Sequence, residues 1–122
     1  MAAGRDPGCP RIVVVNRPAL EAFAAALAEP ALAGPFDLAF VDALKHEYRA
    51  YLEAIIRRLV PGALVIADNV LWAGRVSGER PTGPGDGTDA LRAFNAAVMR
   101  DLRFTATILP VGDGLLLAGF RG

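Results

Sequence analysis

Cysteine and histidine are nearly absent from this 122-residue chain, and neither sign of charge is in excess. The single cysteine, Cys9, cannot form an internal disulfide, and this favours a reducing cytoplasm. Between Gly8 and Pro10 it is not expected to act as a nucleophile, and the single histidine, His46, is predicted to be a surface residue. With 13 basic and 13 acidic residues, the chain lacks the basic excess of a surface for nucleic acids or anionic membranes.

Long apolar runs are missing as well. No run of about 18 apolar residues occurs, so no transmembrane helix is predicted. Residues 1–10 have no apolar segment of the signal-peptide kind and are predicted to be a flexible start. A hydrophobic fraction of 53% with 21% charged residues instead predicts one packed domain over residues 1–122.

Short apolar runs alternate with helical patterns in the first two thirds of the chain. Residues 11–15, 36–41 and 63–67 are predicted to be buried strands. Residues 19–28 and 46–59 have the composition or the apolar spacing of helices. Strand, helix and strand recurring with short connections predict an α/β fold, in which crossover helices join parallel strands.

The rest of the chain has a different pattern. Residues 73–88 are rich in glycine and proline and are predicted to be a mobile loop, before a helix over 89–102 that Thr88 or Asp89 would cap. Apolar residues alternate with threonine over 104–108, and the chain returns over 115–120 after a turn. This pattern predicts an antiparallel hairpin at one edge of the sheet.

Acidic residues follow two of the predicted strands. Asp42 ends the strand at 36–41, and Asp68 with Asn69 ends the strand at 63–67. Ligands of open parallel sheets collect at the carboxyl ends of the strands, and carboxylate and amide oxygens suit Mg²⁺, Ca²⁺ or Mn²⁺. The plain structural alternative is that Asp42 caps a helix and that Asp68-Asn69 forms a turn.

Two further features allow a chemical and a structural interpretation. Lys45, three residues after Asp42, could act beside a metal as a base on a hydroxyl, or it could be an ordinary solvated lysine. The stretch 83–87 resembles a nucleotide-binding glycine loop, but it follows a polar loop instead of a strand, and Asp86 would repel phosphate. A nucleotide-binding module is therefore only a third hypothesis.

Four motifs in order resemble the cation-dependent O-methyltransferases, a family that includes the catechol and caffeoyl-CoA enzymes. They are 36–45 together with Tyr48, then 60–74, 90–95 and 109–117, with a weaker match at 11–21. The resemblance covers nearly the whole chain. It implies the later half of a Rossmann-like methyltransferase sheet.

The resemblance also implies roles for individual residues. Asp42, Asp68 and Asn69 would hold a divalent cation such as Mg²⁺, and Asp42 would also border the cofactor S-adenosylmethionine. Lys45 would assist deprotonation of a small, catechol-like acceptor, and Trp72 would contact that acceptor. The acceptor oxygen would then attack the methyl group of S-adenosylmethionine.

The chain departs from the family on the cofactor side. The family's glycine-rich turn for S-adenosylmethionine would precede Arg11, so we expect a truncated domain that lacks this segment and binds the cofactor weakly. Leu44 stands where the family commonly has an acid, Ala73 where it often has an asparagine, and Arg17-Pro18 where it has a small turn. The alternative hypothesis is a non-catalytic remnant or subunit that associates through an exposed sheet edge, for example as a homodimer.

Overall fold

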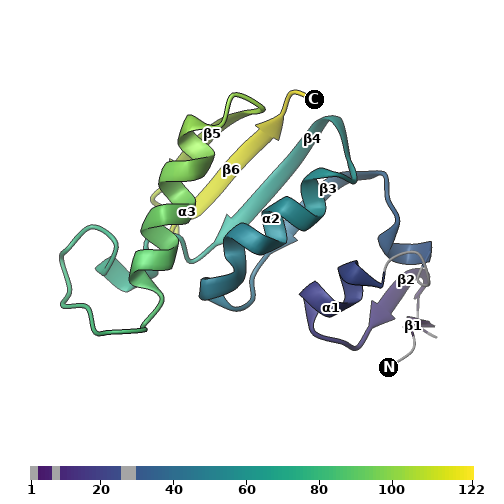
Figure 1. Cartoon of the computed structure of the whole chain (residues 1–122), viewed down its shortest axis with the longest axis horizontal. Coiled ribbons are helices and arrows are strands. Elements are labelled where there is room, and N and C mark those ends of the chain that lie inside the picture. The colour runs from purple at the N-terminus through teal and green to yellow at the C-terminus, as the bar shows by residue number, and fades with distance from the viewer. Residues whose placement is uncertain (1–2, 7–8, 26–29) are drawn as a thin grey trace. The chain divides into compact units, whose positions relative to one another are not determined.

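A computed structural model describes residues 3–6, 9–25 and 30–122, with side chains from Ile12 onward. The chain divides into two compact units, Met1–Pro35 and Phe36–Gly122, and each is considered by itself (Figure 1). The expectation of one domain over 1–122 stays a prediction.

The first unit contains a two-stranded antiparallel ribbon of β1 (Ala3–Asp6) and β2 (Cys9–Val15), followed by α1 (Ala19–Ala24) and the 3-10 turn Pro30–Leu32. Residues 3–6 thus form a strand within the start that the sequence predicts to be flexible. Residues 26–29, the predicted end of the helix, lie outside the described residues.

The prediction that residues 11–15 form a buried parallel strand is wrong. They lie in a strand, but β2 pairs with β1 in antiparallel register. Ile12, Val13 and Val14 are 50%, 37% and 56% exposed. The physical reason is that a two-stranded ribbon provides no layer of its own that could cover its faces.

The second unit is built on a four-stranded sheet in the order β3 (Phe36–Val41), β4 (Leu59–Asp68), β6 (Leu115–Phe120), β5 (Phe104–Leu109). Strands β3 and β4 are parallel, and β4–β6 and β6–β5 are antiparallel. The predicted parallel pair and the closing hairpin are therefore confirmed. Strand β4 begins at Leu59, four residues before the predicted start at residue 63.

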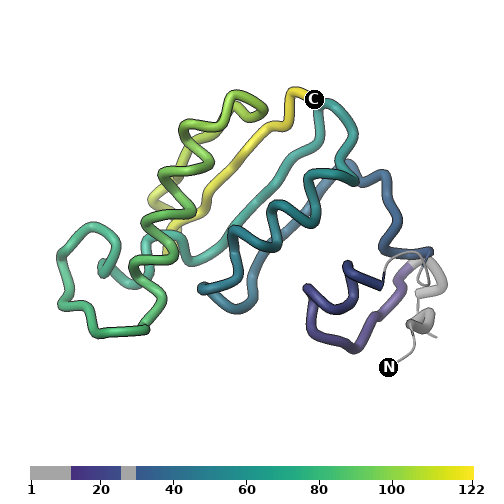
Figure 2. Tube along the Cα trace, viewed as in Figure 1, coloured from purple at the N-terminus to yellow at the C-terminus, as the bar shows by residue number. Residues whose placement is uncertain are grey.

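Two helices cover one face of this sheet. Helix α2 (Tyr48–Ile56) follows the 3-10 turn η3 (Lys45–Glu47), and α3 (Thr88–Arg100) follows the 3-10 turn η4 (Trp72–Gly74) and a long loop. Figure 1 and the trace in Figure 2 show α2 and α3 on the same side of the strands. Side chains of the helices and of the covered sheet face form the buried core: Tyr48, Leu52, Ile55, Leu91, Phe94, Val98, Val65, Ala67, Leu116 and Ala118.

The start of α3 differs from the prediction. Gly87, with φ 89°, precedes the helix, and Thr88 is its first residue, so neither Thr88 nor Asp89 caps it. The carboxylate of Asp86 instead accepts the Thr88 N–H at 2.9 Å. An aspartate two residues upstream of the donor thus provides the hydrogen bond expected from a cap.

The opposite face of the sheet remains open within this unit. Leu38 and Phe40 of β3 are 57% and 59% exposed, and Leu64 of β4 is 37% exposed. In the part of the chain that the structure describes, no helix is long and apolar enough to cross a membrane.

Candidate functional site

The topology brings the two acidic strand ends to one edge of the sheet. Strands β3 and β4 run parallel with Val41 opposite Ala67, and the next residues along the chain are Asp42 and Asp68. This is the juxtaposition that the sequence predicts, because the carboxyl ends of parallel neighbours meet at one edge.

Lys45 connects these strand ends. It is the only lysine in the sequence. Its Nζ donates to Tyr48 OH at 2.7 Å, to Asn69 Oδ1 at 3.0 Å and to Asp42 Oδ1 at 3.4 Å. The side chain is only 11% exposed, whereas that of Asp42 is 50% exposed. The prediction of an ordinary solvated lysine therefore does not fit the geometry.

Tyr48 fixes the position of Lys45 against β4. Its hydroxyl accepts from Lys45 Nζ and donates to the carbonyl oxygen of Asp68 at 2.8 Å. Burial raises the pKa of Tyr48, and the Lys45 hydrogen bond opposes that shift in part. The phenol thus remains a neutral link between the start of α2 and the end of β4. In the sequence Tyr48 stands out only as part of a family motif, although its spacing of three residues from Lys45 indicates a contact.

Asn69 adopts a left-handed backbone conformation with φ 64°. Its N–H donates to Asp68 Oδ1 at 2.7 Å, and its side-chain oxygen accepts from Lys45. Its side-chain Nδ2 donates to Asp113 Oδ2 at 3.0 Å. Asp113 comes from the turn between β5 and β6 and was not among the residues chosen from the sequence.

Trp72 lies beside the same lysine. The centroid of its ring is 5.6 Å from Lys45 Nζ, a cation–π geometry. The indole Nε1 donates to the carbonyl oxygen of Asp86 at 2.7 Å. Trp72 is therefore positioned at the border of the site, where an acceptor contact is predicted.

The loop at 73–88 is attached to the rest of the unit by several hydrogen bonds. Arg92 donates to the carbonyl oxygens of Val76 at 3.1 Å and Arg75 at 3.0 Å. A Cβ built on Gly87 would lie 3.1 Å from Lys45 Cβ, so the end of the loop packs closely against the site. Mobility of the loop stays a prediction.

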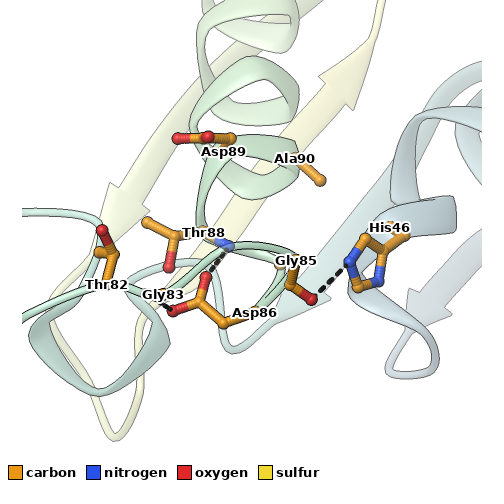
Figure 3. A pocket seen from close by; sticks show the side chains of 9 residues that line it. His46, Thr82, Gly83, Gly85, Asp86, Thr88, Asp89 and Ala90 are labelled. Atoms are coloured by element: carbon orange, nitrogen blue, oxygen red, sulfur yellow. Dashed lines mark hydrogen bonds between the residues drawn. The ribbon is translucent and has the colours of Figure 1, made fainter.

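A small hollow lies at the start of α3 (Figure 3). Inside it, the Asp86 carboxylate accepts the N–H groups of Thr88 at 2.9 Å and Gly83 at 3.0 Å. Hydrogen bonds from Thr88 and Gly83 lower the pKa of Asp86 to about 2. Because a carboxylate already uses these N–H groups, the loop is poorly suited to phosphate. His46, predicted to be a surface residue, is exposed and lies 3.1 Å from Gly85 O.

The strand ends are also the predicted metal site. Across residues 3–6, 9–25 and 30–122, no group of three His, Cys, Asp or Glu side chains is arranged to hold a metal ion. A cation at this edge would rest on Asp42, Asp68 and the amide oxygen of Asn69. The Lys45 ammonium already lies between Asp42 Oδ1 and Asn69 Oδ1, so these oxygens converge on a positive charge. Such hard oxygen donors fit Mg²⁺, Ca²⁺ or Mn²⁺.

Known proteins resemble the chain along most of its length. It is 42% identical to a catechol O-methyltransferase of Niastella koreensis over 91 residues, which cover 70% of this chain and 40% of the relative. It is 37% identical to caffeoyl-CoA O-methyltransferase 2 of Zea mays, over 82% of this chain and 39% of the relative. The chain thus spans about 40% of the length of these curated relatives.

Solved structures indicate the same fold. The O-methyltransferase TomG from Streptomyces achromogenes, determined in complex with SAM, matches with a TM-score of 0.70 and 33% identity, over 86% of this chain and 48% of that one. The expected Rossmann-like α/β class is thereby confirmed. A family model described as O-methyltransferase matches residues 4–120. The chain therefore belongs to the O-methyltransferase family.

Proposed function

We propose that this chain carries the metal-and-acceptor half of an S-adenosylmethionine-dependent O-methyltransferase site, which methylates a hydroxyl of a small, catechol-like acceptor. The observation that carries the proposal is the convergence of Asp42 Oδ1 and Asn69 Oδ1 on Lys45 Nζ at adjacent strand ends. The names of the catechol and caffeoyl-CoA relatives and the SAM complex of TomG support it.

The residues of this site would have separate roles. Asp42, Asp68 and Asn69 would hold a divalent cation, which supplies Lewis-acid stabilisation of the acceptor oxygen. The Lys45 ammonium would assist deprotonation by stabilising the negative charge that develops on the acceptor oxygen as its proton leaves to solvent, and Trp72 would form one wall for the acceptor ring. S-adenosylmethionine would supply the methyl group for the acceptor oxygen, and the residues of this chain would contribute mainly orientation and charge stabilisation.

The methyl-donor half of the site is expected to be weak in this chain. Leu44 is apolar where the family commonly has an acid, and Arg17-Pro18 stands where the family has a small turn. Asp42 alone would border the donor. We therefore expect weak or undetectable binding of S-adenosylmethionine by calorimetry, and micromolar binding would contradict this part of the proposal.

Thermal melting with Mg²⁺ or Mn²⁺ tests the cation site. A ligand that binds only the folded state raises the melting temperature, so saturating cation should stabilise the wild type. Asp42→Ala and Asp68→Ala should abolish that rise. Asp89→Ala is the matched control, because the Asp89 side chain is 99% exposed on α3 and should not affect the rise. A wild-type melting curve that ignores both cations would refute the proposal.

Association between two copies is a second candidate function. Strand β3 lies at an edge of the four-stranded sheet and carries the exposed side chains of Leu38 and Phe40. An unpaired strand edge beside an apolar face favours pairing with another strand. Two copies of β3 could pair antiparallel about a two-fold axis, which would make a closed dimer.

Light scattering after size-exclusion chromatography tests this association. The wild type should have the mass of a dimer, and Phe40→Lys should shift it to the monomer. Leu102→Lys is the control, because Leu102 is 87% exposed and lies outside the β3 strand. A wild type that stays monomeric at tens of micromolar would exclude this function.

A further inference from the structure

We propose that Asp113, in the turn between β5 and β6, is a positioning residue that sets the orientation of the Asn69 side-chain amide and thereby presents its oxygen to a divalent cation. The inference rests on the proposed function. It adds a residue that is not one of the cation donors and reaches the site from a different part of the fold, 44 residues further along the chain.

The Asn69 amide lies between two partners with opposite requirements. Lys45 Nζ can only donate hydrogen bonds, so the atom 3.0 Å from it must be the oxygen. The Asp113 carboxylate can only accept, so the atom 3.0 Å from Oδ2 must be the nitrogen. Each partner by itself fixes which way the amide faces, and the two agree.

Binding of a cation would break one of these two hydrogen bonds and leave the other in place. The Lys45 ammonium lies against the same oxygen that a cation would need, so it would have to leave Asn69 Oδ1. The Asp113 contact is on the far side of the amide and can remain. Asp113 would then be the residue that keeps the Asn69 oxygen directed at the cation. Groups that orient metal ligands typically change metal affinity 10- to 100-fold when altered, so about tenfold is a reasonable expectation.

The turn that carries Asp113 is itself held against the segment after Asn69. Leu71 N–H donates to the Asp113 carbonyl oxygen at 3.0 Å, and Val70 N–H donates to the Gly114 carbonyl oxygen at 3.2 Å. The other Asp113 carboxylate oxygen, Oδ1, accepts the N–H of Ala73. Asp113 is thus fixed in place by contacts that do not involve the Asn69 side chain.

Asp113→Asn separates the positioning role from this structural role. The new amide oxygen can still accept from Ala73, but its nitrogen then faces the nitrogen of Asn69. Two donors repel each other, and rotating the Asn69 amide to relieve this would turn a nitrogen toward Lys45 and the cation. We expect Mn²⁺ affinity measured by calorimetry to fall about tenfold, with a lower melting temperature even without metal.

The same change in an Asn69→Asp background provides the matched control. The carboxylate introduced by Asn69→Asp would face the carboxylate of Asp113, whereas an asparagine at position 113 could donate to it. Asp113→Asn should therefore lower the metal-free melting temperature when residue 69 is asparagine and raise it when residue 69 is aspartate. A role confined to anchoring Ala73 predicts a shift of the same sign in both backgrounds.

These measurements distinguish a failure of the positioning role of Asp113 from a failure of the proposed cation site. Opposite signs of the melting shift together with a tenfold loss of Mn²⁺ affinity support the positioning role. An Asp113→Asn variant that binds Mn²⁺ within twofold of wild type, or that shifts melting equally in both backgrounds, overturns it while the cation site stands. A wild type that binds no Mn²⁺ overturns the proposed function, and with it the role of Asp113 toward a cation.

Discussion

Lys45 Nζ lies 3.0 Å from Asn69 Oδ1, although 24 residues separate them in the sequence. The contact joins the turn after β3 to the turn after β4. The same ammonium reaches Asp42 Oδ1 at 3.4 Å, so the one lysine of the chain contacts two of the oxygens proposed to bind a divalent cation. A cation bound at the proposed site would therefore compete with the lysine for these two side chains.

This competition predicts that Lys45→Met raises cation affinity. In Lys45→Met, with no acceptor substrate present, a cation could bind the oxygens of Asp42 and Asn69 without first displacing an ammonium group. We expect Mn²⁺ to bind about three- to tenfold more tightly, which corresponds to roughly 0.7–1.4 kcal/mol. Lys45→Arg keeps the charge and serves as the control, with affinity near or below wild type. Calorimetry measures both, and weaker binding by Lys45→Met would show that the lysine assists the cation instead of competing with it.

Gly114 is predicted to tolerate no side chain. A Cβ there would lie 2.5 Å from Leu71 Cγ and 2.9 Å from the Leu71 backbone nitrogen, at a φ of +86°. Gly112 also has a positive φ, +56°, but no atom lies within 4 Å of its Cβ position. Gly112→Ala should cost about 1–2 kcal/mol of unfolding free energy for the backbone alone. Gly114→Ala should cost roughly 1–3 kcal/mol more through overpacking. Urea denaturation measures the unfolding free energy of both variants. Equal decreases for Gly112→Ala and Gly114→Ala would contradict the close packing of Gly114 against Leu71.

Alanine-to-glycine substitutions should have opposite effects at two exposed positions. Ala73 has φ 54°, a left-handed conformation that costs an alanine about 1–2 kcal/mol, so Ala73→Gly should stabilise the protein by up to about 1 kcal/mol. Ala93 lies inside α3, where glycine is about 1 kcal/mol less favourable than alanine. Thermal melting should show a rise for the first and a fall for the second. A fall for both would mean that Ala73 is not held in the left-handed region.

The Asp86 hydrogen bonds predict a pH-dependent contribution to stability. The pKa of Asp86 is lowered from 3.8 to about 2, so the folded state favours the carboxylate. Its contribution is fully present above the unfolded pKa and is lost as the pH falls from about 4 to about 2. Asp86→Asn should therefore melt below the wild type at pH 7, and the gap should narrow below pH 4. Asp89→Asn, at a 99% exposed side chain, is the control. A gap that stays constant down to pH 3 would count against the carboxylate as its cause.

The sequence predicted the parts of the fold that depend on local pattern. The parallel pair β3–β4 and the closing hairpin follow from apolar runs and turn residues, and these place Asp42 and Asp68 at one edge. The predicted burial of β2 is wrong at Ile12, Val13 and Val14, because an apolar run indicates a strand but does not identify the layer that covers it. Burial depends on which elements pack against a strand, and the apolar run itself does not identify them.

The supporting contacts of the site were beyond sequence reasoning for a related reason. Asp113 reaches Asn69 across 44 residues, through a hairpin turn whose register depends on side-chain packing along β5 and β6. The predicted cap of α3 is wrong because the Thr88 N–H donates to Asp86, which lies in the preceding loop. Position 87, just before the helix, is a glycine and is not recognisable as a cap residue. The donors could be chosen from residue type and position, but the residues that orient them required the structure.

The most direct test of the cation site is a crystal structure of the chain grown with Mn²⁺ and measured with anomalous scattering. We predict one strong anomalous peak at the ends of β3 and β4, bonded to carboxylate oxygens of Asp42 and Asp68 and to Asn69 Oδ1, with Lys45 Nζ moved away from Asn69. Bonds near 2.2 Å are expected for a hard divalent cation of this size, roughly between those of Mg²⁺ and Ca²⁺. Crystals that contain Mn²⁺ but show no peak at these oxygens, with Lys45 Nζ still 3.0 Å from Asn69 Oδ1, would contradict the proposed cation site.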